Sequence, residues 1–142
     1  MKRRGVINQP LSQALAGLGH GDCFLLCDAG FPIPKDVERI DLALSFNVPS
    51  MQQCLKAILD EIVVQKVIYA AEMPELNADG AAFVRQTFQN QEVVQVPQSE
   101  LVELAQKAKF IVCSGELGCY SNILMEAASG VEQFKRSLVI DL

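Results

Sequence analysis

The sequence predicts an α/β fold, a largely parallel sheet with helices on both of its faces. Two observations support this. Short apolar runs recur along the chain and are typical of buried strands. Between them lie stretches with apolar residues at helical spacing, several of which begin at a helix-capping residue. Strands that alternate with helices in this way form parallel sheets, because each helix carries the chain back across a face of the sheet.

The predicted elements follow one another with short connections. Strands are expected at 23–27, 40–44, 67–71, 93–96 and 110–113, and helices at 10–18, 50–61, 77–88 and 99–108. Gly19 is expected to end the first helix, and Ser50, Asn77 and Ser99 to begin the other three. Two prolines make 31–34 a stiff loop. Segments 122–125 and 137–142 are compatible with either a strand or a helix.

Composition and charge limit the class of protein. The chain has 142 residues, half of them hydrophobic and a fifth charged, which fits one globular domain over 1–142 and favours an oligomer. The net charge is −5 and the only basic run is at 2–4, so no nucleic-acid partner is expected. No apolar stretch approaches the ~20 residues of a membrane span, and no signal peptide is recognised, so we expect a cytoplasmic protein.

The sequence lacks the residues that several kinds of chemistry require. The five cysteines form no Cys-x-x-Cys pair and there is one histidine, so no metal site is expected and the thiols are interpreted as structural. The sequence contains neither a Walker loop nor a Gly-x-Ser-x-Gly nucleophile motif. No cofactor is expected, and proton transfer is the chemistry that remains.

Polar residues at the ends of the predicted strands are the first candidates for a site, since ligands of parallel sheets bind outside the carboxyl ends of the strands. Asp28 ends one strand and is well placed to bind a hydroxyl group. Ser114-Gly115-Glu116 ends another, and Tyr120-Ser121-Asn122, soon after, supplies neutral donors and acceptors that suit a polyhydroxyl ligand. The alternative interpretation is that these residues only form turns.

His20 is the candidate for proton transfer. It lies between Gly19 and Gly21, which allow a ligand to approach the backbone closely, and Asp22 is in reach to orient the ring. The alternative is an exposed loop histidine without a role. The glycines at 17, 19 and 21 do not form a dinucleotide loop, because they follow a helix and precede a strand.

Taken together, these segments resemble the D-ribose pyranase and fucose mutarotase family. The similar segments run from the N-terminus to Met125 and include 2–8, 18–22, 27–34, 39–44, 71–72, 114–116 and 120–122. Gly30 and Pro34 bring the chain closer to D-ribose pyranases, since fucose mutarotases usually have a bulkier residue at the first position and lack the second proline. Residues 126–142 are a poorly matched C-terminal extension.

The resemblance implies a D-ribose pyranase-like fold and a ring-shaped homodecamer with active sites at subunit contacts. It implies interconversion of β-D-ribopyranose and β-D-ribofuranose in support of ribose utilisation, with a monosaccharide, ribose first, as the ligand. By position, His20 is the proton donor, and the sugar-binding residues are Asp28, Gln98, Tyr120, Ser121 and Asn122.

Gln98 departs from the family pattern, because family members often have a second histidine in this place. Glutamine binds a hydroxyl but cannot transfer protons. Two alternatives therefore stay open: a mutarotase of another free sugar, such as fucose or allose, and a sugar-binding or regulatory protein without turnover.

Overall fold

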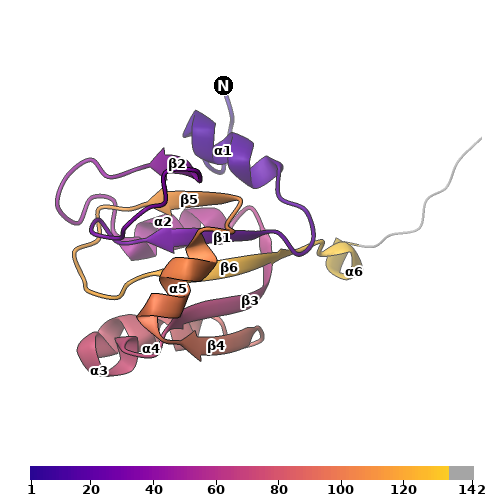
Figure 1. Cartoon of the computed structure of the whole chain (residues 1–142). Helices are drawn as coiled ribbons and strands as arrows, with labels where there is room; N and C mark the ends of the chain where they lie inside the picture. The colour runs from indigo at the N-terminus through magenta and orange to yellow at the C-terminus, as the bar shows by residue number, and fades with distance from the viewer. Residues whose placement is uncertain (135–142) are drawn as a thin grey trace, which may run out of the picture.

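The computed structural model describes residues 1–134, in which six strands form one sheet with helices packed on it (Figure 1). The elements, in chain order, are α1 (Gln9–Ala16), β1 (Cys23–Cys27), β2 (Glu38–Asp41), α2 (Met51–Leu59), β3 (Val63–Ala70), α3 (Met73–Leu76), α4 (Ala78–Thr87), β4 (Glu92–Val96), α5 (Gln98–Ala105), β5 (Phe110–Cys113), β6 (Ile123–Ala128) and α6 (Val131–Phe134). No helix in this part of the chain is both long and apolar enough to cross a membrane.

The sheet has the strand order β2-β5-β1-β6-β3-β4 and is mostly parallel, as predicted. β2, β5 and β1 are parallel to one another, and so are β3 and β4, whereas β6 is antiparallel to both of its neighbours, β1 and β3. Parallel neighbours need a long crossover connection, usually a helix. Only residues 114–122 join β5 to β6, and β6 returns through the sheet in the opposite direction.

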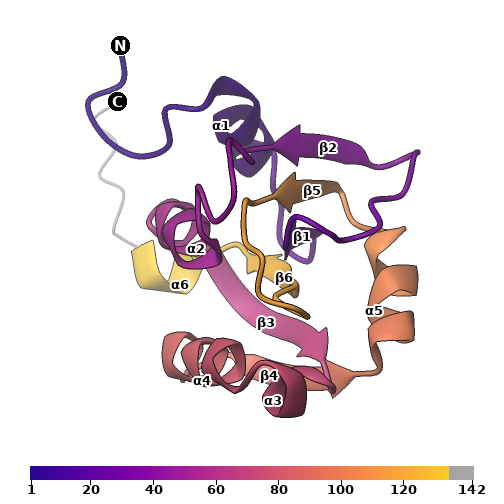
Figure 2. The same ribbon diagram turned by 90° about the vertical axis from the view of Figure 1, so that its left-hand side faces the viewer.

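Helices cover both faces of the sheet, which confirms the predicted architecture. Figure 2 shows α2 and α4 on one side of the strands and α5 on the other. On the first face, Leu55 of α2 and Val84 of α4 pack in one apolar cluster with Phe24 of β1. On the second, Leu101 of α5 packs in a separate cluster with Ile111 of β5. The buried strands between the two clusters form a rigid platform for the loops at their ends.

The observed elements differ from the predicted ones mainly at their ends. α1 ends at Ala16 with Gly17 as its C-cap, where Gly19 was expected to end the helix. β2 begins two residues and ends three residues earlier than the strand expected at 40–44. α5 begins at Gln98 after Pro97, so Ser99 is not its N-cap. The short α3 was not predicted.

The two segments left open are treated differently by the structure. The ambiguous segment 122–125 leads into β6, a strand in the interior of the sheet. The expected boundary at residue 126 therefore falls inside β6, which continues to Ala128. Segment 137–142 lies outside the described residues.

Candidate functional site

A cavity of about 440 Å³ opens at the edge of the sheet where β1, β4 and β5 end. Four of the predicted site residues line it: Asp28, Gln98, Tyr120 and Asn122. Phe31 and Pro32, which belong to the loop after β1, form part of its wall. Because β6 is antiparallel to the other strands, the residues before its start lie at the same edge as the residues after β1 and β4. The reversed strand thus brings Tyr120 and Asn122 into the cavity.

Asp28 is held by the loops around it. Its carboxylate accepts a hydrogen bond from the Gly30 N–H at 3.0 Å, and its own N–H donates to Oδ1 of Asn122 at 2.9 Å. Burial raises the pKa of Asp28, although hydrogen bonds from Gly30 and Asn122 act in the opposite direction. The group is therefore a half-buried carboxylate whose affinity for protons is higher than usual, as suits a residue that accepts a proton or a hydroxyl hydrogen bond.

Gln98 presents a buried acceptor. It is the first residue of α5, and its N–H donates to both carboxylate oxygens of Glu72, at 3.2 and 3.0 Å. Its side-chain Oε1 is buried, and no described residue donates a hydrogen bond to it. Because buried polar atoms are normally paired, this oxygen is a natural acceptor for a ligand hydroxyl.

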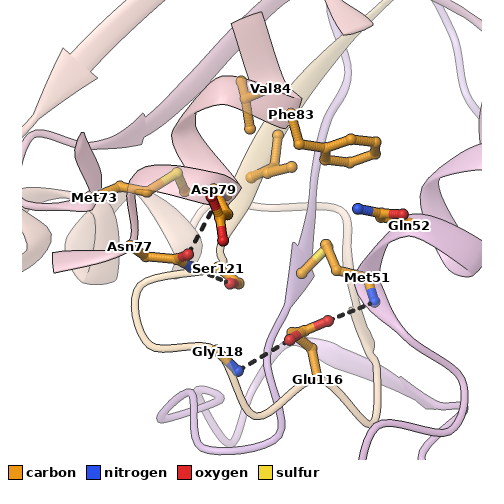
Figure 3. Close-up of a pocket in the computed structure, with 12 residues that line it drawn as sticks. Met51, Gln52, Met73, Asn77, Asp79, Phe83, Val84, Glu116, Gly118 and Ser121 are labelled. Atoms are coloured by element: carbon orange, nitrogen blue, oxygen red, sulfur yellow. Dashed lines mark hydrogen bonds between the residues drawn. The ribbon is translucent and has the colours of Figure 1, made fainter. Parts of the chain in front are cut away.

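Ser121 lies apart from its two neighbours. Tyr120 and Asn122 line the cavity, whereas Ser121 lines a second cavity of about 280 Å³ between α2 and α4, shown in Figure 3. Its Oγ accepts a hydrogen bond from Asn77 at 2.8 Å. Glu116 and Gly118 border both cavities, so residues 116–121 form the partition between them.

Glu116 ties this partition to a helix. Its carboxylate accepts hydrogen bonds from the N–H groups of Gly118 and Met51, both at 3.0 Å. Met51 is the first residue of α2, whose N-terminal N–H groups lack partners within the helix. A carboxylate is stabilised at this position, so Glu116 fastens the loop after β5 to α2.

His20 lies at the other end of β1 from Asp28. The α1–β1 connection carries His20. Figure 1 shows this connection at the opposite end of the strands from the β5–β6 connection. At ~3.3 Å per residue, the five-residue strand alone separates the two by about 16 Å. The structure therefore does not bring His20 and Asp28 of one chain into one cavity.

The His20 ring is exposed and held through one nitrogen. Nδ1 accepts a hydrogen bond from the Ser129 N–H at 3.2 Å, so the proton of the neutral ring is on Nε2. The predicted role of Asp22 is not what the structure shows, since its carboxylate binds Lys109 and the Gly19 N–H, each at 2.7 Å. These contacts lower the pKa of Asp22 and shape the loop. The ring is left presenting an Nε2–H donor outward.

Two residues near the cavity had no role in the sequence-based site. Glu72 belongs to a segment of the family resemblance, and Asn77 was predicted only as a helix cap. The structure shows that Glu72 holds Gln98 and that Asn77 contacts Cys119 and Ser121. No local pattern indicates such contacts, because they join residues that are distant in sequence.

The fold and the cavity are typical of proteins that bind a small, hydroxyl-rich ligand at the strand ends of an α/β sheet. Residues 1–131 match the model of the RbsD / FucU transport protein family, and the chain belongs to this family. It is 40% identical over 135 residues to D-ribose pyranase 2 of Rubrobacter xylanophilus, covering 94% of this chain and 88% of that protein.

Solved structures agree with this assignment. RbsD of Bacillus subtilis, solved in complex with D-ribose, superimposes with a TM-score of 0.87 at 36% identity, covering 90% of this chain and 98% of that one. The fucose mutarotase of Streptococcus pneumoniae, in complex with L-fucose, matches with a TM-score of 0.72 at 22% identity over the same shares, and supports the fold alone.

Proposed function

We propose that this protein is a D-ribose pyranase, which interconverts β-D-ribopyranose and β-D-ribofuranose by opening and closing the sugar ring. The observation that carries the proposal is the convergence of Asp28, Gln98, Tyr120 and Asn122 on one cavity of about 440 Å³. Family membership, the identity to a D-ribose pyranase and the likeness to a ribose complex support the same substrate.

The chemistry needs one acid and one base. His20 acts as the imidazolium, which forms when Nδ1 takes a proton in place of the Ser129 hydrogen bond, and it donates its Nε2 proton to the ring oxygen to become the neutral imidazole. Asp28 at the same time accepts the proton of the anomeric hydroxyl. The bond between C1 and the ring oxygen breaks, and the open-chain aldehyde forms. After rotation, the hydroxyl on C4 adds to C1 in place of the one on C5, with the protons returned in reverse. Positioned acid–base groups contribute about 10²–10⁴-fold, enough to accelerate a reaction that already occurs in water.

We further propose that the acid comes from a neighbouring copy of the chain, in a ring-shaped homodecamer. His20 and Asp28 lie at opposite ends of β1, so a second copy that places its His20 over the cavity completes the site. An apolar patch beside the cavity supports this. Leu44 and Phe46 are 83% and 82% exposed, and Leu117, at 53%, lines the cavity itself. Such a patch marks an interaction surface.

The cytoplasm is the compartment we propose for this enzyme. All five cysteines are free thiols in the structure, which suits a reducing environment. Cys119 is exposed at the edge of the cavity, where an oxidising compartment would leave it open to modification.

Ribose ring exchange, measured by NMR magnetisation transfer, tests the reaction and the acid together. We expect the protein to accelerate pyranose–furanose exchange and His20→Ala to lose nearly all of the acceleration, because the ring oxygen then lacks its proton donor. Ser129→Ala is the matched control, since it keeps the backbone N–H that binds His20. Ribose binding without faster exchange would instead identify a sugar-binding protein, and faster exchange of L-fucose than of ribose would identify a mutarotase of another sugar.

A further inference from the structure

Tyr120 has a backbone conformation that is unusual for its residue type. Its φ is +55°, in the left-handed region that favours glycine, and a bulky side chain there is strained. Strained residues of this kind persist only where the surroundings enforce the conformation, and they concentrate at functional sites. Tyr120 lines the proposed sugar cavity, so whatever enforces its φ also sets the shape of that cavity.

One side chain contacts both neighbours of Tyr120. Nδ2 of Asn77 donates hydrogen bonds to the carbonyl oxygen of Cys119 at 2.9 Å and to Oγ of Ser121 at 2.8 Å. These two residues flank Tyr120 directly. Figure 3 shows Asn77 joined to Ser121 by a hydrogen bond on the wall of the second cavity. The amide group thus holds both neighbours of Tyr120 without reaching the sugar cavity.

The side-chain amide of Asn77 is itself held in place by helix α4. Oδ1 of Asn77 accepts the Gly80 N–H at 3.0 Å and caps the N-terminus of α4. Ala81 and Val84 of that helix are buried in the apolar core. The packing of α4 in the core therefore fixes the position of Asn77. The hydrogen bonds of Asn77 in turn fix residues 119–121 relative to α4.

We propose that Asn77 is a positioning residue of the sugar site, which holds Tyr120 in its sugar-binding conformation from behind. This inference rests on the proposed function. The competing interpretation is that Asn77 only caps α4. The two roles use different atoms of the amide, since Oδ1 caps the helix and Nδ2 holds the partition, so they are separable by substitution.

Asn77→Asp separates them. Aspartate caps helices about as well as asparagine, so α4 keeps its N-cap. The Nδ2 donor is replaced by a carboxylate oxygen, which faces the Cys119 carbonyl oxygen and repels it. We expect KM for ribose to rise about tenfold, the range expected when one or two hydrogen bonds are lost, with kcat within about twofold of the wild-type value. The melting temperature should stay close to that of the wild type.

A second substitution tests whether the effect passes through Tyr120. Asn77→Asp is combined with Tyr120→Ala, and ribose affinity is measured for all four proteins by NMR titration. If Asn77 acts by positioning Tyr120, the Asn77→Asp change has little further effect once the ring is gone, so the two losses are not additive. Ser121→Ala removes one of the two acceptors and should raise KM by a smaller factor.

Asn90→Asp is the control for the added charge, because Asn90 is exposed and precedes β4, whereas Gln98 of the site follows that strand. A wild-type KM in Asn77→Asp, or an equal loss in the Tyr120→Ala background, would overturn the inference. A fall in melting temperature that accounts for the lost activity would assign Asn77 to capping alone. If the wild-type protein neither binds nor converts ribose, the proposed function fails instead, and the two failures are thereby distinguished.

Discussion

At the scale of single residues, the site depends on a carboxylate that is neither fully exposed nor fully buried. Asp28 follows the buried strand β1 and lines the cavity together with Phe31, Pro32 and Tyr120. Its pKa is raised because burial disfavours the charged form more than the surrounding N–H groups stabilise it. The same partial burial favours the acceptance of a proton, which is the role proposed for Asp28.

Ribose affinity should therefore depend on pH through Asp28. The charged carboxylate is the better acceptor for sugar hydroxyls, so the dissociation constant should increase as the pH falls through the raised pKa, by about tenfold for each pH unit below it. Because the pKa is raised, the loss begins at a higher pH than for an ordinary aspartate. Asp28→Asn should bind more weakly at pH 7 and show no such dependence.

Isothermal titration between pH 7 and pH 4 measures this, with circular dichroism to verify folding at each pH. Asp36→Asn is the control, since Asp36 is an exposed carboxylate in the loop after the prolines. If the dissociation constant of Asp28→Asn still increases with falling pH as it does in the wild type, another group controls binding.

At the scale of elements, helix N-termini hold the loops of the site. α2 begins with a capping box, in which Ser50 Oγ accepts the Gln53 N–H and the Gln53 side chain accepts the Ser50 N–H. The next N–H, of Met51, is bound by Glu116 from the partition between the cavities. α4 binds the same partition through Asn77. Two helices on one face of the sheet thus fasten the loop that carries Tyr120.

Ser50→Ala should lower the free energy of unfolding by about 1 kcal/mol, because the Gln53 N–H loses its acceptor. Ser99→Ala is a matched control from another helix: Ser99 lies in the first turn of α5, but Pro97 occupies the N-cap position. We expect the control to change stability by less than about 0.5 kcal/mol. Urea denaturation followed by circular dichroism measures both variants, and equal effects would refute the role of the cap.

At the scale of the whole molecule, the proposed mechanism requires residues from two chains. The acid and the carboxylate lie at opposite ends of the strand that joins them. In a closed ring, each chain can offer its His20 to one neighbour and its cavity to another, because such contacts join two different surfaces of the same protein.

Mixing two inactive variants tests this arrangement. His20→Ala and Asp28→Ala are each expected to be nearly inactive, and subunits mixed at equal amounts under exchanging conditions should recover about one quarter of the wild-type ring-exchange rate, since a quarter of the sites then have both residues. Size-exclusion chromatography with light scattering gives the assembly state. Absence of recovery in verified mixed oligomers would place both residues of each site in one chain.

How far local sequence predicts this structure depends on burial. Strands β1 and β5 were predicted to the residue, because both consist of apolar residues that are buried on both sides of the sheet. Ser50 and Asn77 were recognised as helix caps for an equally local reason. β6 was ambiguous, since its apolar residues also fit a helix and only its pairing with β1 and β3 decides the matter.

The sequence by itself determined the architecture and, with the family resemblance, four of the residues that line the cavity of about 440 Å³, because strand ends at one edge of a sheet must meet. Tertiary structure alone decided that His20 lies at the far end of β1 from that cavity, because the whole of this strand separates His20 from Asp28. It also decided the second role of Asn77, whose contacts at positions 119 and 121 join residues more than forty positions apart. Local patterns describe each residue's own element, whereas such contacts arise only when separate elements pack together.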